Sequence, residues 1–132
     1  MKLSVCLAIL VPVVFLMPIY GLMSAQAQHL EVPVIEYADE DLPTCSFGRV
    51  KGLKADGDGF LAVRSGPASS YRKLDELVNG DEVWMYDKKG RWIGVLYAAE
   101  NPGCGPVKKN RPVPYKGKKG WVHENWIELI SG

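Results

Sequence analysis

Two contrasting patterns of apolar and polar residues divide the chain. Residues 3–23 are almost wholly apolar, whereas from residue 45 onward short apolar runs alternate with turns rich in Gly, Asp and Asn. Such runs are typical of β-strands, and no stretch has the 3.6-residue period of a long amphipathic helix. We expect strands at 47–53, 60–64, 82–87, 91–98, 120–123 and 126–130, with a shorter extended piece at 73–77. Five or six short antiparallel strands predict an all-β fold, either a small barrel or a sandwich.

The N-terminal segment has the features of an export signal. A positively charged start, the apolar run over 3–23 and the sequence Ser-Ala-Gln-Ala ending at Ala27 match a signal peptide of residues 1–27. A retained membrane anchor is the alternative, because the run approaches the roughly 20 residues that span a bilayer. Pro12 and Pro18 interrupt the run and would disrupt a permanent helix, which favours a cleaved signal.

Residues 28–44 look like a connection between the signal and the folded part. They are acidic, contain two prolines and show no sustained period, so the sequence predicts a flexible leader or linker. Only 32–35 has the composition of an edge strand. The folded domain is therefore expected over 45–132.

Cleavage leaves two cysteines, Cys45 and Cys104. An even number of cysteines in a small exported domain indicates a disulfide bond. Cys104 lies in the proline- and glycine-rich stretch 99–119, which would otherwise be a long untethered loop. The competing role, a nucleophilic cysteine, needs a thiolate and a positioned base. We expect the disulfide.

Four segments in order resemble the bacterial SH3-like domain family. They are Phe-Leu-Ala-Val-Arg-Ser-Gly-Pro-Ala-Ser-Ser-Tyr at 60–71, Leu-Val-Asn-Gly-Asp-Glu-Val at 77–83, Gly-Arg-Trp-Ile-Gly-Val at 90–95 and Gly-Trp-Val-His at 120–123. The resemblance covers roughly 46–130 and implies a small SH3-like barrel. The chain departs from the family at Ala62, where Asn is usual, and in the long loop 99–119.

Charge and composition exclude several functions. Removing residues 1–27 takes away one lysine and no acid, so the net charge of +1 becomes zero and no basic face for nucleic acid is indicated. The Asp-Gly-Asp-Gly turn at 56–59 lacks the first carboxylate and the final glutamate of a calcium loop. His29, His123 and the two cysteines lack the close spacing of zinc ligands. We expect no metal, no cofactor and no catalytic residues.

Aromatic and basic residues are the candidates for a binding site. Tyr and Trp rings suit an extended peptide, although most rings in so small a barrel belong to the core. Residues 108–119 contain six basic residues and no acid. Lysines of this basic cluster near a groove would pair with free carboxylates, and the alternative is that the cluster is simply a solvated loop. The candidates are Tyr71, Trp92, Tyr115, Trp121, Lys116, Lys118 and Lys119. Because the loop leads directly into Gly120 and Trp121, we expect its lysines at one end of an aromatic groove.

The resemblance implies a binding module, because members of the family are targeting modules of cell-wall hydrolases or stand alone in exported proteins. Fold alone does not identify the ligand. We expect an exported, non-catalytic module, periplasmic or extracellular and free of the membrane after cleavage, that recognises a peptide or peptidoglycan-type ligand. The alternative is an inhibitor or accessory module that docks on another exported protein through 99–119. An enzyme ranks third, because a separate catalytic domain does not fit in this length.

Overall fold

The computed structural model describes Pro12 and residues 29–54, 56–57 and 59–132. The predicted signal peptide, and the alternative anchor, lie outside the described residues except for Pro12. In the part that is described, no helix has the length and apolar character needed to cross a membrane.

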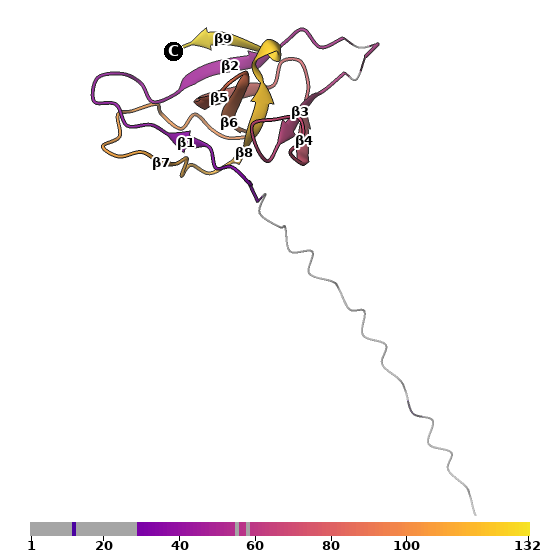
Figure 1. Cartoon of the computed structure of the whole chain (residues 1–132), viewed down its shortest axis with the longest axis horizontal. Coiled ribbons are helices and arrows are strands. Elements are labelled where there is room, and N and C mark those ends of the chain that lie inside the picture. The colour runs from indigo at the N-terminus through magenta and orange to yellow at the C-terminus, as the bar shows by residue number, and fades with distance from the viewer. Residues whose placement is uncertain (1–11, 13–28, 55, 58) are drawn as a thin grey trace, which may run out of the picture.

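Seven antiparallel strands form the main sheet, with the order β4-β3-β8-β6-β5-β2-β9 (Figure 1). These strands are β2 (Ser46–Val50), β3 (Leu61–Arg64), β4 (Lys73–Leu77), β5 (Glu82–Lys89), β6 (Trp92–Tyr97), β8 (Lys118–His123) and β9 (Ile127–Ser131). A 3-10 turn, η1 (Glu124–Trp126), separates β8 from β9. The all-β SH3-like fold expected from the sequence is confirmed.

The strand count exceeds the expected five or six. The piece at 73–77 is a complete strand, paired with β3 from Leu61 opposite Leu77 to Arg64 opposite Lys73. A second, two-stranded sheet pairs β1 (Ile35–Glu36) with β7 (Arg111–Pro112), and Figure 1 shows these strands side by side at the flank of the barrel. The added strands come from segments whose sequences carry little periodic signal.

The inner core follows from the alternation of apolar residues along the strands. Buried side chains from β2 to β8 meet inside the barrel, namely Val50, Leu61, Val63, Leu77, Val83, Val95, Tyr97 and Val122. Gly120 lies where β8 passes closest to β3, and a Cβ there would overlap the side chain of Val63. The glycine of the Gly-Trp-Val motif therefore allows the two strands to approach.

Residues 29–44, here termed the strap, are not the flexible leader predicted from the sequence. Val34 and Glu36 are buried, and the Ile35 amide donates a hydrogen bond of 3.1 Å to a carboxylate oxygen of Asp87. The prediction was wrong for residues 29–44 because their strand is two residues long and its partners lie more than 70 positions away. A local sequence pattern carries no information about such pairing.

The segment 99–119 is fixed to the strap at several points. The Cys45–Cys104 disulfide is present, with a Cα–Cα distance of 5.0 Å, as expected from the cysteine count. Strand β7 pairs with β1, and Asp39 forms an isolated antiparallel bridge with Val107. Strap and loop together cover a second apolar cluster on the outer face of the sheet, made by Val34, Cys45, Trp84, Tyr86, Leu96, Val113 and Trp121.

Candidate functional site

Trp121 cannot contribute to a groove in this structure. Its side chain is fully buried, and its indole N–H donates a hydrogen bond of 2.8 Å to the carbonyl of Val32 in the strap. Val32 itself donates from its amide to the carbonyl of Ser65 at 3.0 Å. The ring that the sequence suggested for ligand binding is therefore part of the core beneath the strap.

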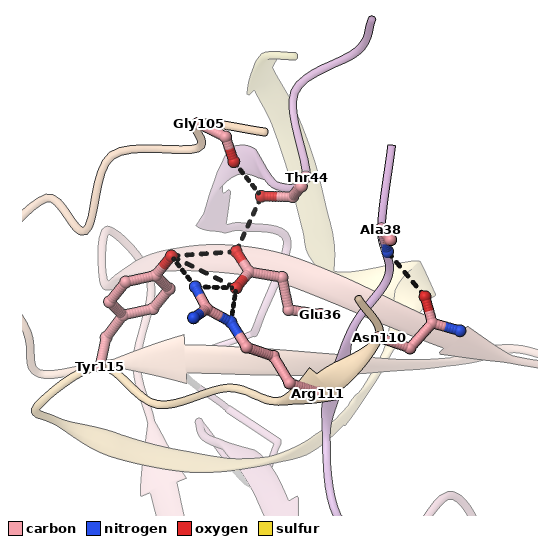
Figure 2. A network of polar contacts seen from close by, with 7 residues as sticks. All are labelled: Glu36, Ala38, Thr44, Gly105, Asn110, Arg111 and Tyr115. Atoms are coloured by element: carbon pink, nitrogen blue, oxygen red, sulfur yellow. Dashed lines mark hydrogen bonds and ion pairs between the residues drawn. The ribbon is translucent and has the colours of Figure 1, made fainter. Parts of the chain in front are cut away.

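Tyr115 belongs to a polar network around Glu36, which Figure 2 shows at the junction of strap and loop. Glu36 is fully buried and accepts hydrogen bonds from Arg111 Nε at 2.9 Å, from the Tyr115 hydroxyl at 3.1 Å and from the Thr44 hydroxyl at 2.8 Å. Nearby, Asn110 Oδ1 accepts from the amide of Ala38 at 2.7 Å. The network holds the two segments together, and it gives the hydroxyl of Tyr115 a structural role as a donor to Glu36.

Electrostatics agree with this structural role. Burial, followed by the Glu36 carboxylate, raises the pKa of the Tyr115 hydroxyl, so that it stays protonated as a donor. The hydrogen bond to Glu36 is the largest cause of the raised pKa of Arg111. Both groups therefore stay protonated and can donate hydrogen bonds to the Glu36 carboxylate.

We expect Glu36→Gln to lower the free energy of unfolding by roughly 2 to 3 kcal/mol, because the amide leaves buried donors poorly paired. Arg111 is 43% exposed and recovers part of the loss from water. Urea unfolding would measure the change, with the exposed Glu40→Gln as a control expected within about 0.5 kcal/mol of the parent. Equal stability of the two variants would show that the network contributes little.

The three lysine candidates lie away from any groove formed by Trp92. Lys118 faces Tyr97 across the β6–β8 pair, at the opposite end of β6 from Trp92, and forms an ion pair of 3.2 Å with Asp75. Lys116 is exposed in the loop, and Lys119 is paired with Leu96 in register. These lysines do not flank the groove at Trp92, but Lys118 lines a second groove, which also contains Trp84 and Tyr97.

Trp92 does line a groove, here termed the basic groove. It has a volume of about 560 Å³ and lies across β3, the start of β6, the end of β8 and η1. Its lining residues are Phe60, Leu61, Ala62, Arg64, Ser69, Lys73, Trp92, His123 and Trp126. Among the described residues, that lining holds two cations and no carboxylate.

The aromatic part of the basic groove is built by strand register. Trp92 and His123 face each other across the β6–β8 pair, and their rings meet edge to face with centroids 5.5 Å apart. His123 Nδ1 accepts a hydrogen bond of 3.2 Å from the Asn125 amide, within η1. The turn then presents Trp126, which is 37% exposed. An apolar ligand surface can stack on these rings.

The basic part comes from β3 and β4. Arg64 Nη1 donates to the Tyr71 carbonyl at 3.1 Å, while its buried Nε has no hydrogen-bond partner in the described structure. Lys73 Nζ lies 4.9 Å from the centre of the Phe60 ring and pairs with Glu76 at 2.6 Å. The buried Nε is not accessible to a ligand, but an anionic group entering the groove would meet the positive charge of the Arg64 side chain, which lines it.

Tyr71 supports the groove rather than lining it. The Tyr71 ring lies over Gly66, where an added Cβ would come 2.6 Å from ring carbons. Glycine at 66 thus permits the turn that follows β3, and the Tyr71 carbonyl orients Arg64. Of the predicted site residues, only Trp92 lies in the basic groove.

Sequence reasoning missed most residues of the groove. Arg64 belongs to the Arg-Ser-Gly-Pro part of the family motif, and its position as a cation directly before a turn could have identified it as a candidate. Phe60 and Trp126 gave no such signal, because an aromatic residue at the end of a β run is equally typical of the core. In the described part of the chain, no group of three or more His, Cys, Asp or Glu residues is arranged to hold a metal ion.

Comparisons with known proteins give one match. A family model described as "Bacterial SH3 domain" matches residues 59–128, more than half of the 132 residues. The matched region begins just before β3 and ends within β9, so it includes the whole basic groove. No curated protein and no solved structure matches significantly.

Proposed function

Because this chain belongs to the bacterial SH3 domain family, whose members are generally binding modules, we propose that it is a non-catalytic module that binds through the basic groove. The ligand is an extended peptide or a peptidoglycan fragment that carries a free carboxylate. The protein acts after export, in the periplasm or outside the cell, where the Cys45–Cys104 disulfide is stable.

One observation carries the proposal: three aromatic side chains and the cationic side chain of Arg64 share a groove whose described lining has no carboxylate. Phe60, Trp92 and Trp126 offer apolar faces for stacking, and Arg64 offers a charged donor. A stem peptide of peptidoglycan combines apolar side-chain groups on an extended backbone with free carboxylates, which matches both halves of the groove.

We expect Trp126→Ala to weaken binding to purified peptidoglycan about tenfold or more, because an exposed aromatic anchor is typical of binding hot spots. Arg64→Gln should weaken binding several-fold at about 0.1 M salt and less at about 0.5 M, because charge interactions are screened. Co-sedimentation with peptidoglycan over a range of salt concentrations measures both effects.

The matched control is Lys116→Gln, which removes an exposed cation outside the basic groove and should bind as the parent does. Circular dichroism of each variant establishes that the barrel is folded. If folded Trp126→Ala and Arg64→Gln variants still sediment as the parent does, the basic groove is not the binding site. If the parent itself does not sediment, peptidoglycan is not the ligand, and affinity capture from a periplasmic extract tests a protein partner instead.

A further inference from the structure

A second groove, here termed the acidic groove, lies at the other end of β6. Two adjoining cavities of about 840 and 430 Å³ share the side chains of Glu82, Trp84 and Ala99. Tyr97, the last residue of β6, lines this groove, whereas Trp92, the first, lines the basic groove. Trp92 and Tyr97 are five residues apart, and at about 3.4 Å per residue the two grooves are separated by about 17 Å along the strand.

The floor of the acidic groove is aromatic and rigid. The rings of Phe47 and Trp84 lie on adjacent strands with centroids 5.5 Å apart and an interplanar angle of 49°. The Cys45–Cys104 disulfide forms part of the same lining and joins the start of β2 to the segment 99–104. A ligand would therefore enter a preformed apolar surface instead of ordering one.

Carboxylates dominate the rim of this groove. Asp75, Asp81, Glu82 and Glu100 line it, and Lys118 is the only cation in its described lining. Lys118 is committed to Asp75 at 3.2 Å, and Glu82 faces Arg49 at 3.7 Å with both side chains about half exposed. The excess of negative charge complements a cationic ligand.

Asp75 remains charged under ordinary conditions. Burial raises its pKa, but hydrogen bonds from the Glu76 amide, the Tyr97 hydroxyl and Lys118 together outweigh burial, and the net pKa lies below its usual value. The Asp81 carboxylate accepts from the Val78 amide at 2.8 Å, which fixes its position. Two of the four rim carboxylates, Asp75 and Asp81, are thus held in place before a ligand arrives.

An unpaired strand edge borders the same groove. In the described part of the chain, β9 pairs only with β2, and its last residue, Ser131, lines the groove together with Gly132. Leu129 and Ile130 of β9 are 64% and 44% exposed. An open edge with exposed apolar side chains is suited to pairing with an extended segment.

We propose that the acidic groove docks an extended segment of a protein partner, with a lysine or arginine side chain between Glu82 and Glu100 and apolar side chains on Phe47 and Trp84. This second site is independent of the basic groove, so the protein would hold an anionic ligand at one end of β6 and a cationic protein segment at the other.

The four tryptophans allow a test that distinguishes the two grooves. Trp84 lines the acidic groove although it is only 8% exposed, Trp92 and Trp126 line the basic groove, and Trp121 is fully buried. The probe is an acetylated, amidated nine-residue peptide with alternating lysine and valine, compared with the same peptide carrying glutamate for lysine. Titration into the full exported protein, followed by the indole N–H signals in nitrogen-15 correlation spectra, should move the Trp84 signal with the lysine peptide only.

A double variant, Glu82→Gln with Glu100→Gln, should weaken the lysine peptide about tenfold at low salt and remove most of its salt dependence. Asp56→Asn is the matched control, because Asp56 is exposed and lines neither groove. The proposal is overturned if the lysine peptide leaves Trp84 unchanged, if the glutamate peptide moves it equally, or if the double variant binds as the control does. A Trp84 signal that shifts with protein concentration alone would assign the groove to a second copy of the chain and also overturn it.

Discussion

Replacing Trp121 by alanine is expected to lower the free energy of unfolding by about 3 to 5 kcal/mol, the range for large aromatic side chains in cores. The side chain is fully buried between the sheet and the strap, so its removal leaves a cavity that neighbouring residues fill only in part. The substitution also removes the donor to the Val32 carbonyl. Because proteins are stable by only about 5 to 15 kcal/mol, this loss is between a fifth and the whole of the free energy of unfolding.

Thermal and urea unfolding of Trp121→Ala measure this loss, and hydrogen exchange of the Val32 and Ile35 amides reports whether the strap has loosened. The control is Leu129→Ala, which shortens an apolar side chain that is 64% exposed and should change stability by no more than about 0.5 kcal/mol. A stable Trp121→Ala variant with protected strap amides would show that the tryptophan does not anchor the strap.

Removal of the disulfide by the double change Cys45→Ser and Cys104→Ser should cost about 4 kcal/mol in the chain-entropy model. The two residues are 59 positions apart, so the bond restricts a long loop in the unfolded chain. In the folded protein it also holds segment 99–104 beside Thr44, whose amide donates to the Cys104 carbonyl at 3.3 Å. The variant should therefore lose both stability and the shape of the acidic groove.

Urea unfolding of the double variant, and of the parent with and without a reductant, checks this expectation. The reduced parent and the double variant should unfold at the same urea concentration, well below the oxidised parent. Mass spectrometry of the unreduced protein should detect the linked peptides. Free thiols in protein taken from the periplasm, or identical unfolding of all three samples, would contradict the prediction.

The barrel strands were predictable because each of them carries its own signal. The alternation of buried and exposed residues in Leu61–Arg64, for example, is visible locally, and the glycine at 90 marked the β5–β6 hairpin, where its φ is +61°. The motif glycines at 66 and 120 proved to be positions where a side chain would overlap a neighbouring residue. At both positions the glycine of the family motif is also the residue that close packing requires.

The binding site was far less predictable. Trp121 and Trp126 look alike in a sequence, yet one is fully buried and the other is 37% exposed. What separates them is the strap, because Val32 and Val34 cover Trp121 while no part of the strap lines the groove at Trp126. Exposure of an aromatic ring depends on which distant segment packs over it.

The sequence by itself determined the all-β class, the strand positions to within a few residues and the Cys45–Cys104 pairing, because period-two alternation, turn glycines and cysteine count are local or countable properties. The choice of a barrel over a sandwich came from the resemblance to the bacterial SH3-like family. The tertiary structure alone decided that residues 29–44 pack as a strap, that the candidate lysines lie away from Trp92, and that two grooves of opposite charge exist. These features arise from contacts between residues separated by tens of positions, such as Glu36 with Arg111. Such contacts form only when the chain brings distant residues together, and the periodic pattern of a single sequence does not reveal which distant residues will meet.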